Sequence, residues 1–245
     1  MIKTILFDLD NTLSHIRNGG AWFREIFLHK YAETVSSGTG VSVDTIKIVV
    51  MKIVKDFKEN PPITKTISDI FFKAISQHLK VDIERIMELT HEFYTKKMLE
   101  LKEFYEPAPK LHEVLNNLRD MNLKIAIATD PVTKTIGVMQ RLKWINLDNF
   151  PFCFISSADT MHAAKPHKAF YKEILKNCNS KPEESMMVGD TYSEDIFAAK
   201  SAGLYAVFID QNQNTDISDW EVKPDFIIHQ LSDVLDLLKK LNQKK

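Results

Sequence analysis

The spacing of hydrophobic and polar residues divides the chain into two kinds of segment. Ile2 to Phe7 is a short run of apolar and β-branched residues, which predicts a buried strand. From about residue 20 to 104, apolar residues recur every three or four positions, a spacing that predicts about four amphipathic helices. Breaks that hold glycine, proline or aspartate, at residues 36–40, 60–62 and 81–82, are expected to separate these helices.

After Pro107 and Pro109 the pattern changes, and predicted helices alternate with predicted strands. This alternation is typical of a parallel sheet with helices on both faces. The expected helices span residues 111–121, 134–142, 168–178, 195–201 and 232–241, and the expected strands span 124–128, 152–156, 186–188, 204–209 and 226–228.

These two patterns predict an α/β protein with a doubly wound, Rossmann-like parallel sheet and an inserted all-helical domain. The first strand belongs with the later strands, so the catalytic core is expected to combine residues 1–14 and 108–245. Residues 15–107 would then form a helical cap inserted after the first strand. Its large apolar residues are expected in the interior of the helical bundle, among them Trp22, Phe71, Phe72 and Met98.

Composition excludes several classes of protein. Apolar residues make up 44% and charged residues 27%, as is usual for a globular protein. With 32 Lys and Arg against 33 Asp and Glu, the net charge of −1 predicts no bulk attraction to nucleic acid or an anionic membrane. No segment approaches the ~20 apolar residues of a membrane span. The N-terminal apolar run is too short for a signal peptide, so we expect a cytoplasmic protein whose Cys153 and Cys178 are reduced thiols.

Polar residues follow several of the predicted strands. In open parallel sheets the carboxyl ends of the strands form the ligand site, so these side chains are expected to meet at one edge. Crowded carboxylates repel one another, and a hard cation such as Mg²⁺, which prefers oxygen ligands, would relieve this repulsion. A carboxylate can attack phosphorus, while a lysine and a hydroxyl group can hold the phosphoryl oxygens. The candidate residues are Asp8, Asp10, Thr129, Lys165, Asp190 and Asp195.

Four segments, taken in order, resemble the four motifs of the haloacid dehalogenase-like hydrolase superfamily. They are Asp8-Leu9-Asp10-Asn11-Thr12-Leu13, the strand that ends at Thr129, Lys165-Pro166, and Gly189-Asp190 with Asp195 after four further residues. The helical insert also lies where the first type of cap domain lies in that family. The resemblance therefore covers the whole predicted core and points to the phosphatase branch.

The resemblance implies a role for each catalytic residue. Asp8 would be the nucleophile that forms an aspartyl phosphate. Asp10 would protonate the leaving alkoxide and later activate water. Thr129 would donate a hydrogen bond to the phosphoryl group, and Lys165 would neutralise both the nucleophile and the phosphate.

The resemblance also implies a Mg²⁺ site. Its ligands would be the side chains of Asp8 and Asp190 and the backbone carbonyl of Asp10. Asp195 would orient this site from behind the ligands or reach the ion through a water molecule.

Asp10 distinguishes between branches of the family. A halide leaves without a proton, whereas an alkoxide needs one, so an acid two residues after the nucleophile suits phosphoryl transfer. The resemblance thus implies a phosphoric monoester hydrolase for a small phosphorylated metabolite, such as a sugar phosphate, a phosphoglycolate-like acid, a nucleoside monophosphate or pyrophosphate. A phosphomutase on the same core and a catalytically silent metabolite-binding protein stay open as alternatives. The sequence carries no signal for the oligomeric state.

Asp130 departs from the commoner pattern, in which an asparagine follows the hydroxyl residue. It precedes Pro131, which favours extended backbone geometry. Two readings follow: Asp130 caps the next helix, which we favour, or it adds negative charge beside the phosphate site.

Overall fold

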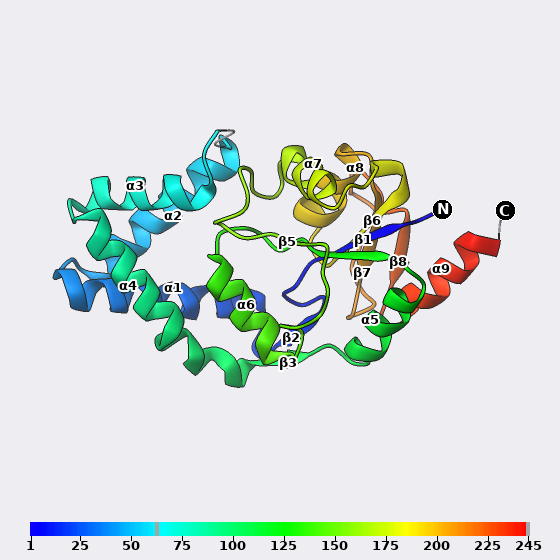
Figure 1. Cartoon of the computed structure of the whole chain (residues 1–245), viewed down its shortest axis with the longest axis horizontal. Coiled ribbons are helices and arrows are strands. Elements are labelled where there is room, and N and C mark those ends of the chain that lie inside the picture. The colour runs from blue at the N-terminus through cyan, green and yellow to red at the C-terminus, as the bar shows by residue number, and fades with distance from the viewer. Residues whose placement is uncertain (62–63, 244–245) are drawn as a thin grey trace.

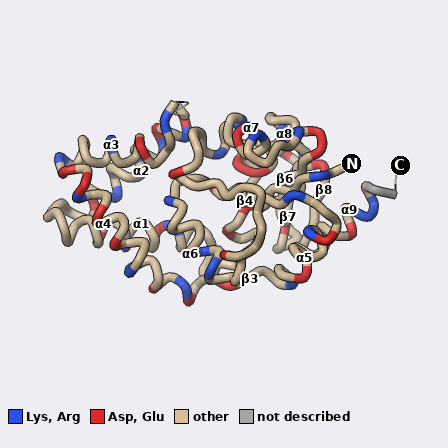
Figure 2. The backbone as a smooth tube through the Cα atoms, in the orientation of Figure 1, with Lys and Arg blue, Asp and Glu red and all other residues tan. Residues whose placement is uncertain are grey.

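The computed structural model describes residues 1–61 and 64–243, and it places an α/β part beside a helical part (Figure 1). The expected break at residues 60–62 includes Pro62, which lies outside the described residues. Lys, Arg, Asp and Glu are interspersed over both parts of the chain (Figure 2).

Within the described residues, the α/β part contains a six-stranded parallel sheet with the order β5-β4-β1-β6-β7-β8. The central strand β1 lies between β4 and β6, so that Phe7 is beside Ile127 on one side and Val188 on the other. The doubly wound parallel sheet that the sequence predicts is confirmed. The strands are β1 (Thr4–Phe7), β4 (Lys124–Ile127), β5 (Phe154–Ile155), β6 (Ser185–Gly189), β7 (Tyr205–Ile209) and β8 (Phe226–Ile228).

Helices cover both faces of this sheet, with α7 and α8 on one face and α5 and α9 on the other (Figure 1). Between β6 and α8 the chain forms one π-helical segment, Tyr192–Phe197, where the sequence predicts a helix only from Asp195. A short 3₁₀ turn, Pro182–Glu184, precedes β6. The helices are α5 (Leu111–Asp120), α6 (Thr135–Trp144), α7 (Lys168–Asn177), α8 (Ala198–Ser201) and α9 (Asp233–Gln243).

The helical part is inserted between β1 and β4, as the sequence predicts. Its helices are α1 (Gly20–Thr39), α2 (Val43–Glu59), α3 (Ile67–Leu79) and α4 (Ile83–Thr95), followed by a 3₁₀ segment, Lys97–Phe104. The expected break at residues 36–40 is too long, because α1 continues to Thr39. It ends at Gly40, whose φ of 75° suits glycine and whose N–H bonds to the Ser36 carbonyl.

A two-stranded antiparallel sheet, which the sequence does not predict, joins the two parts. Strand β2 (Ser14–Ile16) leaves the core and pairs with β3 (Tyr105–Pro107), which returns to it. Both strands are only three residues long, too short for a periodic pattern. The domain boundaries predicted at residues 14 and 108 lie at this sheet and stay a prediction. No helix among the described residues combines the length and hydropathy of a membrane span.

The expectation of two reduced thiols is wrong in this structure. Cys153 and Cys178 form a disulfide with their Cα atoms 5.4 Å apart, within the usual range for such a bond. Cys153 precedes β5 and Cys178 ends α7, so the sheet brings together two residues separated by 25 positions. Cysteine count and composition carry no information on this spatial proximity.

Candidate active site

Asp8 lies directly after the central strand, at the carboxyl edge of the sheet. Its N–H bonds to the Val188 carbonyl of β6 at 3.0 Å, which holds the loop against the sheet. The side chain is buried, and burial raises its pKa to about 7, although Lys165 acts in the opposite direction. This carboxylate depends on nearby positive charge to stay ionised.

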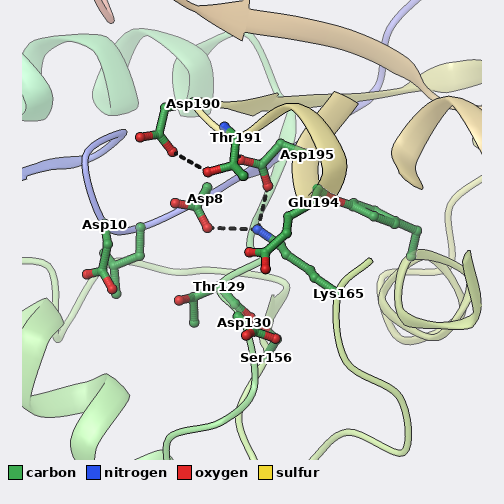
Figure 3. A network of polar contacts seen from close by, with 12 residues as sticks. Asp8, Asp10, Thr129, Asp130, Ser156, Lys165, Asp190, Thr191, Glu194 and Asp195 are labelled. Atoms are coloured by element: carbon green, nitrogen blue, oxygen red, sulfur yellow. Dashed lines mark hydrogen bonds and ion pairs between the residues drawn. The ribbon is translucent and has the colours of Figure 1, made fainter. Parts of the chain in front are cut away.

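Lys165 supplies that charge. Its ammonium group is 1% exposed and donates to Asp8 Oδ1 at 2.7 Å and to Asp195 Oδ1 at 2.6 Å (Figure 3). Burial alone lowers the pKa of Lys165, but the carboxylates of Asp195 and Asp8 outweigh it and raise the pKa well above its usual value. Lys165 is therefore charged, and its ammonium connects the loop after β1, which holds Asp8, to the segment after β6, which holds Asp195.

The loop after β6 contributes two more carboxylates. Burial raises the pKa of both Asp190 and Asp195 to about 6. The Asp195 Oδ2 atom also accepts the Thr191 N–H at 3.0 Å. A Cβ atom at Gly189 would lie 2.3 Å from that same Oδ2, so glycine is needed for this close approach.

Asp8, Asp190 and Asp195 form a group that suits a divalent cation. Each offers a carboxylate oxygen, and the three oxygens lie within 4.8 Å of one another. Three carboxylates face the single ammonium of Lys165, so the site has excess buried negative charge that a hard cation would balance. Asp195 has both oxygens engaged by protein donors, which favours the predicted orienting role over direct ligation.

Thr129 follows β4 and is buried near Asp8 and Lys165 (Figure 3). The Ala128 N–H bonds to the Phe7 carbonyl at 2.7 Å, and the Ser156 hydroxyl donates to the Thr129 carbonyl, also at 2.7 Å. These bonds tie three strand ends together. The structure thus brings Thr129, Lys165, Asp8, Asp190 and Asp195 to one edge, as the sequence predicts.

Asp10 lies to the side of this group, and its side chain has two partners that the sequence reasoning missed. Arg141 Nη1 donates to Asp10 Oδ2 at 2.5 Å, and the Tyr105 hydroxyl donates to Oδ1 at 2.5 Å. Arg141 is only 5% exposed, and its Nε and Nη2 atoms are buried without a hydrogen-bond partner among the residues that the structure describes. An arginine on the apolar face of the 134–142 helix, three residues after Val138, was the available sequence signal.

The capping role favoured for Asp130 is wrong. Helix α6 begins at Thr135, and the Thr135 N–H donates to Asp159 Oδ2 at 2.8 Å, so the carboxylate at this helix start is that of Asp159. Asp130 instead pairs with Lys58 of α2 at 2.6 Å, and the same ammonium binds Glu194 Oε1 at 2.8 Å. The alternative, that Asp130 places a charge beside the site, agrees with this geometry.

Lys58 therefore connects the helical insert to two loops of the active-site edge. Burial lowers the pKa of its ammonium, but the combined effect of the Asp130 and Glu194 carboxylates is larger and raises the pKa above its usual value. The lysine is therefore charged. Burial raises the pKa of Asp130, whereas at Glu194 the effect of Lys58 exceeds that of burial and lowers the pKa.

A cavity of about 900 Å³ lies between the sheet edge and the insert, and Asp8, Asp10, Thr129 and Asp190 line it. Of the residues expected in the bundle interior, Met98 and Phe72 are buried, and Trp22 packs on Phe104 with the ring centroids 4.7 Å apart. Trp22 and Phe71 are only half-buried, and Phe71 and Phe72 both line the cavity, so the expectation of a fully interior position does not hold for all four residues.

Comparisons with known proteins agree with this geometry. A family model described as haloacid dehalogenase-like hydrolase matches residues 2–203. Glyceraldehyde 3-phosphate phosphatase from Methanocaldococcus jannaschii is 29% identical over 245 residues, covering 99% of this chain and 100% of the relative. Pyrophosphatase PpaX from Halalkalibacterium halodurans is 27% identical over 237 residues, covering 97% of each chain.

Among solved structures, a 2-haloacid dehalogenase from Pseudomonas syringae pv. Tomato DC3000 superimposes with a TM-score of 0.67. The match covers 98% of this chain and 100% of that structure at 23% sequence identity. At this level of identity the likeness establishes the fold alone.

Proposed function

The chain belongs to the haloacid dehalogenase-like hydrolases, and we propose that within this family it is a Mg²⁺-dependent phosphatase of a small phosphorylated metabolite. The full-length similarity to phosphatases supports this function. The observation that carries it is the contact of Lys165 with Asp8 and Asp195, at 2.7 and 2.6 Å, beside the Asp10 side chain. Lys165 lowers the pKa of the Asp8 carboxyl against the effect of burial, which favours the ionised form that attacks, while a second carboxyl group lies close by.

In the first step, an Asp8 carboxylate oxygen attacks the phosphorus of the monoester, and the bond from phosphorus to the ester oxygen breaks. The departing alkoxide takes a proton from the carboxyl group of Asp10. Thr129 and Lys165 donate to the phosphoryl oxygens, where negative charge spreads in the transition state. The products of this step are the free alcohol and a phosphorylated Asp8.

In the second step, water attacks the phosphorus of the aspartyl phosphate, and the bond from phosphorus to the Asp8 oxygen breaks. The Asp10 carboxylate takes the proton from the water, so both aspartates return to their starting states. Inorganic phosphate is released. In this conformation both Asp10 oxygens accept hydrogen bonds, from Tyr105 and Arg141, so Asp10 releases one of these donors and takes up a proton from solvent before the first transfer.

The residues that would hold Mg²⁺ are Asp8 and Asp190, together with the backbone carbonyl of Asp10. When bound, the ion neutralises charge on the phosphoryl oxygens. Asp195, fixed by Lys165 and the Thr191 N–H, would keep the loop of Asp190 in place.

The test measures phosphate release from a panel of phosphorylated metabolites, with Mg²⁺ and with a chelator, for the wild-type protein and Asp8→Asn. We expect metal-dependent release that falls at least about 10³-fold in Asp8→Asn, because the amide is not a nucleophile. Asp44→Asn, an exposed change in the first turn of α2, is the control and should retain wild-type activity. Equal activity of Asp8→Asn and wild type, or no release from any ester by wild type, would refute the proposal.

A further inference from the structure

The cavity extends well beyond the residues that would bind a phosphoryl group. Its volume of about 900 Å³ is near the upper end of the ~300–1,000 Å³ usual for ligand pockets. It continues from the carboxylates at the sheet edge to side chains of α1, α2 and α3 in the helical insert. The part inside the insert is therefore available to the alcohol portion of a substrate.

The surface of this inner part is apolar. Phe27 and Leu28 of α1, Val54 of α2 and Phe71 of α3 all line the cavity. Each is half-buried and packs on the hydrophobic core with its covered side. Four apolar side chains from three helices thus leave part of their surface facing the space where a leaving group would lie.

The hydroxyl groups beside them are already bonded within the protein, whereas Arg141, whose Nε and Nη2 atoms have no partner among the described residues, lines the cavity at its reactive end beside Asp10. The Tyr31 hydroxyl contacts Thr90 Oγ1 at 3.1 Å, and Thr90 in turn donates to the Ile86 carbonyl at 2.7 Å. The Tyr94 hydroxyl accepts the Lys134 N–H at 3.3 Å. A sugar hydroxyl buried here would lose its hydrogen bonds to water and compete for groups that are already paired, which is unfavourable.

The charged residues at this end belong to the rim. Four charged residues of the insert line the cavity but are exposed, namely Arg24, Glu25, Lys55 and Glu59, and Lys55 pairs with Glu59 at 3.7 Å. Lys58 lies nearer the sheet edge, where Asp130 and Glu194 hold it. The cavity is therefore charged at its reactive end and at its mouth, and apolar between the helices.

We propose that the preferred substrate is the phosphate monoester of a bulky apolar alcohol, with a branched aliphatic or aromatic group, rather than a sugar phosphate or pyrophosphate. This inference rests on the proposed phosphatase function and specifies its substrate class. It separates the chain from the relatives named for glyceraldehyde 3-phosphate and pyrophosphate, since both of those substrates are small and polar. The apolar contacts exist before and during reaction, so they lower KM and raise kcat/KM.

The experiment uses the full chain with Mg²⁺ and measures phosphate release from ethyl, butyl, hexyl and cyclohexylmethyl phosphate. These alcohols have similar acidity, so the series varies apolar size and not leaving-group ability. Glucose 6-phosphate, glycerol 3-phosphate and pyrophosphate are measured in parallel. We expect kcat/KM to rise about three- to fourfold per added methylene, or on the order of 100-fold from ethyl to hexyl phosphate, mainly through KM.

Substitutions connect this preference to the cavity. Phe71→Asn should reduce the ratio of hexyl to ethyl kcat/KM about tenfold, and Val54→Thr, which keeps the shape of the side chain, about threefold. Ile48→Ser, on the exposed face of α2 at 63% exposure, is the matched control and should leave the ratio unchanged.

Two results would overturn the inference while leaving the phosphatase function intact. One is a kcat/KM that does not rise from ethyl to hexyl phosphate. The other is a higher kcat/KM for a sugar phosphate or pyrophosphate than for hexyl phosphate. An unchanged hexyl-to-ethyl ratio in both cavity variants would also overturn it. Absence of release from every compound would instead remove the proposed function, and the inference with it.

Discussion

Replacing Lys165 with methionine tests the electrostatic account of the site most directly. The methionine side chain has similar length but no charge, so the change removes the ammonium from between Asp8 and Asp195. Lys165 is 1% exposed, and water is therefore poorly placed to compensate. Three carboxylates, including Asp190, would then share a buried edge without a neutralising partner.

The expected loss of stability depends on pH. Removing one partner of a buried ion pair typically costs about 3–5 kcal/mol. Burial raises the pKa values of Asp8 to about 7 and of Asp190 and Asp195 to about 6, so all three are mostly ionised at pH 8. We therefore expect the full ~3–5 kcal/mol at pH 8 in the absence of divalent metal. At pH 5 protons neutralise the carboxylates, and the loss should shrink to about 1–2 kcal/mol, the cost of the missing hydrogen bonds.

The assay is urea denaturation of wild type and Lys165→Met at both pH values in the presence of a chelator. Lys168→Met, an exposed change at the start of α7, is the control and should shift stability by less than about 0.5 kcal/mol. A loss below about 1 kcal/mol at pH 8, or an equal loss at both pH values, would refute the claim that Lys165 neutralises ionised carboxylates.

Three further predictions follow from other contacts. Burial raises the pKa of Asp159, but the Lys134 ammonium and the Thr135 N–H lower it below 3.8. Asp159→Asn should therefore cost about 1 kcal/mol near pH 6, and the difference in urea stability should vanish as the pH falls through this lowered pKa. Lys58→Met should cost about 1–2 kcal/mol in urea denaturation and increase proteolysis of the helical insert; wild-type resistance would contradict the bridge to Asp130. Mg²⁺ at 100 times its dissociation constant should stabilise the protein by about 2.7 kcal/mol in thermal unfolding, and Asp190→Asn should abolish most of this gain.

The parts of the fold that could be predicted are those in which the hydrophobic pattern of a segment agrees with its position in the folded protein. The buried run that ends in Phe7 and the later alternation of strands and helices predict the parallel sheet, because strands buried on both faces are continuously apolar. Strands β2 and β3 could not be predicted. Each has three residues, and their pairing joins Ser14 to Pro107 across the whole insert.

The candidate site divides in the same way. Asp8, Thr129, Lys165 and Asp190 each follow a strand or sit in a motif, so topology alone brings them to one edge. The contact of Arg141 with Asp10 could not be predicted in this way, because Arg141 lies inside a helix, where a charged residue usually faces solvent.

The amino-acid sequence by itself determined which residues follow the strands, which segment is inserted, and which family the motifs resemble. These features are local, and parallel topology converts them into a site without further information. Tertiary structure alone decided which distant groups pair, namely Arg141 with Asp10, Lys58 with Asp130, and Cys153 with Cys178. It also decided which apolar side chains of the insert face a cavity and which face each other. Burial and charge pairing depend on three-dimensional proximity, and no periodicity along the chain encodes the distance between residues that many turns of helix separate.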